Sequence, residues 1–261
     1  MLINNAFINI NRFKALEDKG TLIITHGLAE HSGRFEDIAK RIVNEGYNVI
    51  THDLRGHGKS QGKRGSIKSY KLFIEDLNTI IKLEKKSNPN QKIYLLGHSM
   101  GGLITNLYNI EYGKVDGAII VASPLDYIVK PTLFNKITFK LMGSKKRRTN
   151  FADEKLSHNA HNLNDPLNLK YFRVDLIYQT LIKGLSKLIN NFNKINLPLL
   201  FLYGKKDLLV PLEKSLESHN KFGSKNKRFI TYDESKHDLL HDIEKEKVLN
   251  DIVNWLNERG L

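Results

Sequence analysis

The 261-residue chain has no cysteine. Without thiols it cannot contain a disulfide framework, a cysteine nucleophile or a cysteine-ligated zinc site. It also has no apolar run of about 18 residues, the length that would span a membrane. Asparagines interrupt the first ten residues, MLINNAFINI, which therefore do not resemble a secretion leader. These absences predict a cytoplasmic protein whose contact with a membrane, if it has one, is peripheral.

Acidic residues are scarce relative to basic ones. The chain has 28 Asp and Glu against 41 Lys and Arg, which gives a formal net charge of +13. Such a charge can indicate a nucleic-acid partner or an anionic membrane surface. Lysine is spread along the whole chain, however, and no nucleic-acid-binding motif accompanies it, so we expect no nucleic-acid partner. The one dense basic cluster is KKRR at 145–148. The oligomeric state is not readable from the sequence.

The chain alternates short apolar runs with longer segments of helical period. Continuous apolar runs suit strands that are buried on both faces, and the amphipathic segments between them suit crossover helices. The pattern predicts an α/β fold, with a mainly parallel sheet that helices cover on both faces. The predicted strands are 21–25, 47–53, 92–97, 116–123, 197–204 and 227–233. The predicted helices are 35–46, 69–86, 99–112, 212–223 and a closing helix at 241–258.

The alternation is interrupted between Ser123 and Pro198. About 75 residues lie there, whereas a crossover between parallel strands needs only about a dozen. We therefore divide the chain into an α/β core, residues 1–123 and 198–261, and an inserted helical cap, residues 124–197. Ligands of open α/β sheets bind beyond the carboxyl ends of the strands, and we expect the cap to grow from that edge.

Ser99 lies between an apolar strand and a helix in the sequence YLLGHSMGG. With Gly97 and Gly101 it matches G-x-S-x-G, a motif in which a sharp turn exposes a nucleophilic serine at a helix N-terminus. Because a serine hydroxyl is a weak nucleophile at neutral pH, it needs a neighbouring base. The structural alternative is a Gly-Ser turn that caps the helix, but a cap alone does not require glycine on both sides.

Hydrolases that use this motif supply an acid and a histidine after later strands, in the order Ser, Asp, His. Asp207 follows the strand predicted at 197–204, and His237 follows the strand predicted at 227–233. We therefore predict Ser99, Asp207 and His237 as the catalytic residues. In this assignment His237 takes the serine proton, and Asp207 orients the imidazole.

Other titratable residues near His237 have competing assignments. Asp233 and Asp238 are close enough in sequence to act as the acid, but we interpret them as ordinary turn or N-cap carboxylates. His241 follows one helical turn later, and we interpret it as a surface residue of a helix.

Two further function classes remain as alternatives. A metal-dependent hydrolase could use the closely spaced His52, Asp53 and His57, or His237 and His241 at the i, i+4 spacing of a metal pair. The glutamate of an HExxH motif is missing, and we predict neither a metal nor a cofactor. The other alternative, a hydrolase-fold protein that binds a ligand without turnover, would not need a complete Ser, Asp and His set.

Four segments together resemble the monoacylglycerol lipase and lysophospholipase group of the α/β-hydrolases: THGLAEHSGRFEDIAKRIVNEGYNVITHDLRGHGKSQGKRGSI (25–67), GHSMGG, GKKDLLVP and the His237 segment. The resemblance implies an α/β-hydrolase that cleaves a small lipid ester, a monoacylglycerol or lysophospholipid, through an acyl-enzyme. It also implies that the backbone N–H groups of Leu28 and Met100 form the oxyanion hole. The alternative is a general short-chain carboxylesterase, or a peptidase or other acyl hydrolase on the same fold.

The apolar residues of the cap suggest an acyl-chain pocket. The substrate-binding residues that we predict there are Phe134, Ile137, Leu141, Ile177 and Leu181. Three of them can share one face of a helix that ends just before the basic cluster 145–148. An apolar face beside basic residues suits transient contact with an anionic membrane surface. The alternative is that the basic cluster lies in a solvated loop of the cap and is basic only because the whole chain is.

Overall fold

The computed structural model describes residues 1–127, 130–132, 137–139, 141–151, 153, 155–159 and 165–260. Its central feature is a seven-stranded sheet in the order β11-β10-β7-β6-β4-β5-β3. All neighbouring strands in it are parallel except β3, which pairs antiparallel with β5 at one edge. The strands are β3 (Ile10–Phe13), β4 (Thr21–Thr25), β5 (Asn48–His52), β6 (Ile93–His98), β7 (Gly117–Val121), β10 (Leu199–Gly204) and β11 (Lys227–Tyr232).

Each parallel strand contributes apolar side chains to both faces of the sheet. In β4, Leu22 and Ile24 belong to one buried cluster, whereas Ile23 between them belongs to the other. Tyr94 and Leu95 of β6 divide in the same way. These strands therefore have no solvated face, which is why they are continuous apolar runs in the sequence.

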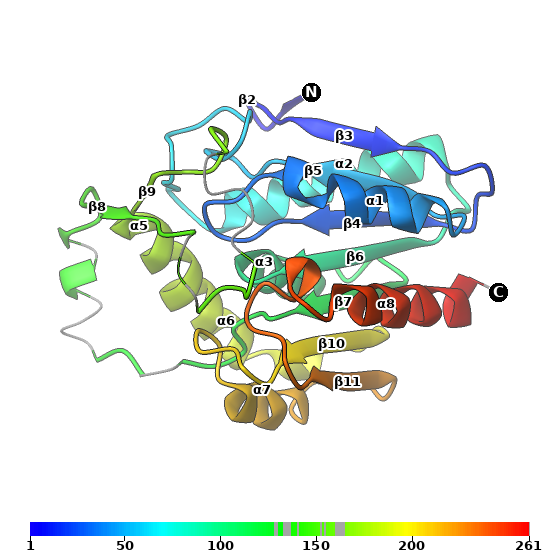
Figure 1. Cartoon of the computed structure of the whole chain (residues 1–261). Coiled ribbons are helices and arrows are strands. Elements are labelled where there is room, and N and C mark those ends of the chain that lie inside the picture. Colours follow the sequence, from blue (N-terminus) through cyan, green and yellow to red (C-terminus); the bar gives the residue numbers. More distant parts are fainter. Residues whose placement is uncertain are drawn as a thin grey trace.

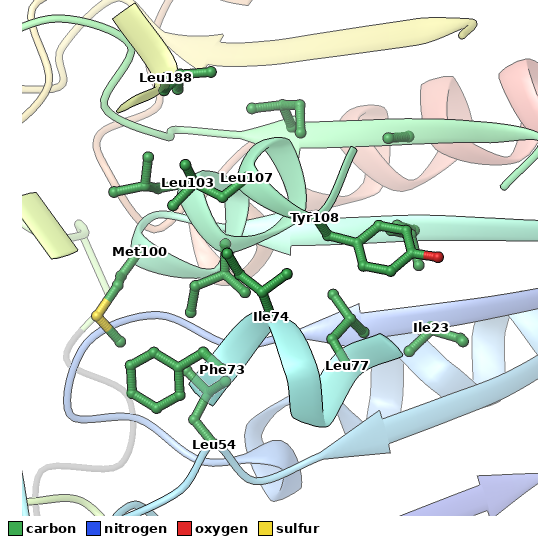
Figure 2. Close-up of a cluster of buried hydrophobic side chains, with 14 of the residues drawn as sticks. Ile23, Leu54, Phe73, Ile74, Leu77, Met100, Leu103, Leu107, Tyr108 and Leu188 are labelled. Atoms are coloured by element: carbon green, nitrogen blue, oxygen red, sulfur yellow. The ribbon is translucent and has the colours of Figure 1, made fainter. Parts of the chain in front are cut away.

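Helices form a layer on each face of the sheet (Figure 1). One layer contains α2 and α3, whose Ile74, Leu77, Leu103 and Leu107 share one buried cluster with Ile23 of the sheet (Figure 2). The other contains α1 and α8, which bury the fully enclosed Trp255. The predicted α/β architecture with helices on both faces is confirmed. These helices are α1 (Glu36–Val43), α2 (Lys71–Ser87), α3 (Met100–Glu111), α7 (Leu212–His219) and α8 (Lys245–Gly260).

The parallel strands all end at the edge that faces the segment between β7 and β10 (Figure 1). A continuous helical stretch there contains α5 (Val174–Ile177), the π-helical η2 (Tyr178–Gly184) and α6 (Leu185–Ile189). This part of the cap is therefore helical, as predicted. It packs on α3. In the described ranges, no helix is long and apolar enough to cross a membrane.

Several short elements were not predicted. Within the cap, β8 (Lys146–Arg148) and β9 (Tyr171–Arg173) form a two-stranded antiparallel sheet. At the N-terminus, β1 (Leu2–Ile3) and β2 (Ala6–Phe7) form a short antiparallel hairpin. The remaining short helices are η1 (Ser32–Phe35), η3 (Phe192–Lys194) and η4 (Leu239–His241).

Candidate active site

Ser99 occupies the turn between β6 and α3 with φ 53° and ψ −119°. A positive φ is strained for a residue with a side chain, and such strain concentrates at functional sites. Glycine is required on both sides, because a Cβ on Gly97 would lie 2.4 Å from the carbonyl oxygen of Gly101. A Cβ on Gly101 would lie 2.1 Å from the carbonyl oxygen of Thr25. The sharp turn predicted from G-x-S-x-G is therefore present, and its glycines are needed for space.

The turn brings Ser99 to the two other predicted residues. His237 Nε2 lies 2.9 Å from Ser99 Oγ, and His237 Nδ1 lies 2.8 Å from Asp207 Oδ2. The second carboxylate oxygen, Asp207 Oδ1, accepts the backbone N–H groups of Leu209 (2.7 Å) and Val210 (2.9 Å). The Asp207 side chain is fully buried. This geometry matches that of a serine nucleophile, a histidine base and an orienting carboxylate.

The loop after β4 lies directly against the serine. A Cβ on Gly27 would lie 3.2 Å from the Cβ of Ser99, so a larger residue would crowd the nucleophile. The next residue, Leu28, lines the space in front of Ser99, and Met100 starts α3 immediately after it. In the described part of the chain, the backbone N–H groups of Leu28 and Met100 donate to no protein atom. They are therefore free to bind an oxyanion.

Behind this loop, Arg34 joins two carboxylates that come from opposite sides of the site. Its guanidinium pairs with Glu30 and, at 2.5 Å, with Asp238. Glu30 also accepts the N–H of Gly27 (2.9 Å). The network thus links the loop after β4 to the residue that follows His237.

This network corrects two assignments made from the sequence. Asp238 does stand at the N-cap position of η4, but its carboxylate makes no capping hydrogen bond there and is instead a buried partner of Arg34. His241 is not a residue of a surface helix: it lies in η4, where Nδ1 contacts Asp238 Oδ1 (2.8 Å) and Nε2 contacts the carbonyl oxygen of Arg34 (2.8 Å). Asp233 is exposed in the turn after β11 and pairs with Lys205, as expected for a turn carboxylate.

The carboxylates of the network stay ionised although they are buried. Burial opposes ionisation of Glu30, but Arg34 and His98 outweigh it and hold the pKa of that carboxyl well below its usual range. Burial likewise opposes ionisation of Asp238, but His241 and Arg34 keep its pKa low. The two loops are therefore joined by charged hydrogen bonds, which are shorter and stronger than neutral ones.

The residues of the metallohydrolase alternative are engaged in other contacts. Asp53 accepts the backbone N–H groups of Ser32 and Lys59, both at 2.7 Å. Burial lowers the pKa of His52 and of His57 to about 3. In the described ranges, the one group with metal-ligand spacing is Glu30, His98 and Asp238. The Arg34 guanidinium already binds both carboxylates of that group, so a cation would have to displace it.

Two cavities meet at Ser99 and His237. The first, of about 330 Å³, is the more polar of the two and is called the polar cavity here: its wall combines Arg148, Asn150 and Asp153 with apolar side chains such as Phe151 and Leu156. The second, of about 290 Å³, is mainly apolar. Its wall includes Met100, Pro124, Tyr127, Ile177, Leu181, Leu185 and Val210. Ser99 is thus positioned between a cavity of mixed lining and a mainly apolar one.

The predicted substrate-binding residues of the cap divide into three groups. The structure brings Ile177 and Leu181 into the wall of the apolar cavity. Ile137 and Leu141 are 49% and 79% exposed and line neither cavity, so the structure does not bring them to Ser99. Phe134 lies outside the described residues.

Comparison with known families identifies the chain. A family model described as "Serine aminopeptidase, S33" matches residues 17–244. The chain belongs to this family. The S33 match includes Ser99, Asp207 and His237 together with the loop that contains Leu28.

Curated relatives of this S33-family chain include proteins named as lipases. The monoacylglycerol lipase of Mycolicibacterium smegmatis is 27% identical over 253 residues, which cover 92% of this chain and 89% of that protein. The human monoglyceride lipase is 26% identical over 255 residues, which cover 92% and 83%. The predicted resemblance to monoacylglycerol lipases is thus confirmed.

Among solved structures, the monoacylglycerol lipase of Paleococcus ferrophilus superposes with a TM-score of 0.85 and 24% identity. The match covers 97% of this chain and 99% of that chain. At this identity the likeness concerns the fold, and it confirms the predicted α/β-hydrolase class.

Proposed function

We propose that this protein is a serine hydrolase that cleaves lipid esters, with monoacylglycerols as its substrates. The observation that carries the proposal is the hydrogen-bonded series Ser99–His237–Asp207, placed where an apolar cavity meets a polar one. The acyl chain would enter the apolar cavity, and the glycerol would occupy the polar one. Relatives named monoacylglycerol lipase and monoglyceride lipase support this choice of substrate.

The proposed reaction has two steps. His237 takes the hydroxyl proton as Ser99 Oγ attacks the ester carbonyl, and the resulting oxyanion is bound by the N–H groups of Leu28 and Met100. The imidazolium then protonates the departing glycerol oxygen, which leaves an acyl-enzyme. A water molecule, deprotonated by His237, attacks the acyl-enzyme, and the fatty acid leaves as Ser99 regains its proton.

The apolar cavity favours a lipid ester over a peptide. An aminopeptidase must bind the free ammonium group of its substrate, for which a carboxylate is the natural partner. Of the carboxylates near Ser99, Glu30 and Asp238 are both paired with Arg34, and Asp207 is bonded to His237. The apolar wall around Ile177 and Leu181 instead suits a hydrocarbon chain. Aminoacyl anilides are therefore expected to be poor substrates.

Acyl-chain length tests the function. Each methylene buried in the cavity contributes about 0.8 kcal/mol, so kcat/KM should rise by up to about fourfold per methylene until the cavity is full. Replacing Leu181 by Trp should shift the optimum to shorter chains. The matched change at the exposed Leu141 should leave it unchanged. The measurement is kcat/KM on monoacylglycerols and p-nitrophenyl esters of increasing length; an optimum at acetate would favour a short-chain esterase instead.

Lysophospholipids are a second candidate substrate because of Arg148. This residue lines the polar cavity, and within the described chain its guanidinium has no acidic partner. A guanidinium binds phosphate well. Including a lysophospholipid of equal chain length in the same panel decides between the two head groups.

We also propose that the cap docks on anionic membranes. The strand β8 contains three consecutive exposed basic residues and pairs with β9, whose Tyr171 is 48% exposed. The exposed side chains of Ile137 and Leu141 precede the cluster in sequence. Each basic residue near such a surface contributes about 1 kcal/mol, so the cluster supports weak, reversible docking.

Docking is tested by changing Lys145, Lys146 and Arg147 together to Ser, with Arg148 kept because it lines the polar cavity. We expect this variant to lose co-sedimentation with anionic vesicles while turnover of a soluble ester is unchanged, and we expect salt to weaken binding by the wild type. A control with the same charge change carries Ser at the exposed Lys82, Lys86 and Lys225. Equal vesicle binding by the two variants would show that net charge, and not the cluster, attracts the membrane.

A further inference from the structure

A segment of the cap, residues 155–159, is bonded directly to the loop that carries His237. The backbone N–H of Asp238 donates to the carbonyl oxygen of Leu156 (2.8 Å). The same segment forms part of the wall of the polar cavity, so the cavity wall and the loop of the base are in contact. Its residues in that wall are Leu156, Ser157 and Asn159.

The carboxylate of Asp242 lies between this segment and the loop, and it is fully buried. On the cap side, Oδ1 accepts the backbone N–H of His158 (2.9 Å) and the hydroxyl of Ser157 (3.2 Å). On the other side, Oδ2 accepts the backbone N–H of Lys236 (2.8 Å), which immediately precedes His237. One carboxylate therefore bridges the cavity wall and the residue next to the proposed base.

Asp242 can accept from both sides only as a carboxylate. Burial opposes its ionisation, but the backbone N–H groups of Lys236 and His158 outweigh burial and hold its pKa below the ordinary value. The ring nitrogen Nδ1 of His158 adds a contact at 3.0 Å. An amide in the same place would direct its NH₂ group at one of these N–H donors.

We propose that Asp242 is a positioning residue for His237 and that it couples the position of the imidazole to the position of residues 155–159. The proposal rests on the proposed role of His237 as base. The backbone N–H groups of both chain neighbours of His237 are hydrogen-bonded here, that of Lys236 to Asp242 and that of Asp238 to Leu156. A displacement of the cavity wall is thereby transmitted to the hydrogen bond between His237 and Ser99.

The test uses the rate of covalent labelling of Ser99 by a fluorophosphonate, which needs no knowledge of the natural substrate. Asp242→Asn is expected to lower the second-order labelling constant by about 10- to 100-fold, the effect of a misplacement near 1 Å. The matched control is Glu244→Gln. Glu244 accepts the N–H groups of Glu234 and Ser235 from the same loop, both at 2.9 Å, and among the described residues it has no bond to 155–159.

A merely structural role predicts that Asp242→Asn and Glu244→Gln lose labelling rate in proportion to their losses of thermal stability. The positioning role predicts that only Asp242→Asn loses rate beyond that proportion. Labelling of Asp242→Asn at the wild-type rate, or in step with Glu244→Gln, would overturn the proposal.

The cap side of the bridge is tested separately with a double variant, Ser157→Ala with His158→Ala, which leaves the bond from Lys236 to Asp242 intact. It should also label more slowly, by about 3- to 10-fold, and adding Asp242→Asn should slow labelling no further than Asp242→Asn alone, because coupled contacts are not additive. If Asp242→Asn fails to fold, the slower labelling of the double variant still carries the test, and wild-type labelling by it contradicts the coupling. A wild-type protein that labels normally but hydrolyses no ester would contradict the proposed function and leave this proposal standing.

Discussion

Replacing Ser99 by alanine is expected to lower kcat by about four to six orders of magnitude, because the covalent step is lost. The hydroxyl oxygen is bonded to His237 and lies at the junction of the two cavities, so its removal opens no void in the core. We expect the thermal stability to change little. The measurement is kcat on a soluble ester, with thermal unfolding of the same preparation as the control for folding.

His237→Ala should reduce kcat nearly as much, since Ser99 then has no base. The two changes together should cost no more than either alone, because the residues act as a unit. A multiplicative loss would mean that the two residues contribute independently, which the 2.9 Å contact between Nε2 and Oγ does not allow.

Asp207→Asn is expected to lower kcat by about four orders of magnitude. The backbone N–H groups of Leu209 and Val210 fix which side of the new amide is its oxygen, because both donate to Oδ1. The amide NH₂ would therefore face His237 Nδ1 and donate to it. The imidazole is then held with its proton on Nε2, where it cannot accept the proton of Ser99.

The control for this change is Asp233→Asn. The Asp233 side chain is 70% exposed and pairs with Lys205 in a surface turn, so kcat should stay within about twofold of wild type. Wild-type turnover by Asp207→Asn, together with loss of activity in Asp233→Asn, would show that the acid has been assigned to the wrong residue.

The sequence predicted the parallel part of the sheet because burial on both faces leaves a local signal. The runs at 21–25 and 197–204 contain β4 and β10, and the apolar residues of these strands each meet one of two apolar layers. The strand β8 gave no such signal. It consists of three exposed basic residues and exists because it pairs with β9, 25 residues later along the chain.

The candidate site shows the same difference between residues that have a local sequence signal and residues that depend on distant contacts. Ser99, Asp207 and His237 could be predicted together because each follows a predicted strand, and the carboxyl ends of parallel strands meet at one edge. The roles of Asp238 and His241 were not readable, because they depend on Arg34, which is about 200 residues away in sequence. A helical period around 237–241 suggested a surface helix, whereas ion pairing with Arg34 and the short turn η4 fix these residues instead.

The central claim is that this chain hydrolyses monoacylglycerols through Ser99. The most direct measurement is glycerol release from a monoacylglycerol by samples titrated with a fluorophosphonate, with the labelled fraction of the Ser99 peptide determined by mass spectrometry. We predict that unlabelled protein releases glycerol and that the rate falls in proportion to the labelled fraction, reaching zero at full labelling. Release that persists when Ser99 is fully labelled, or no release from unlabelled protein that reacts with the label, would contradict the claim.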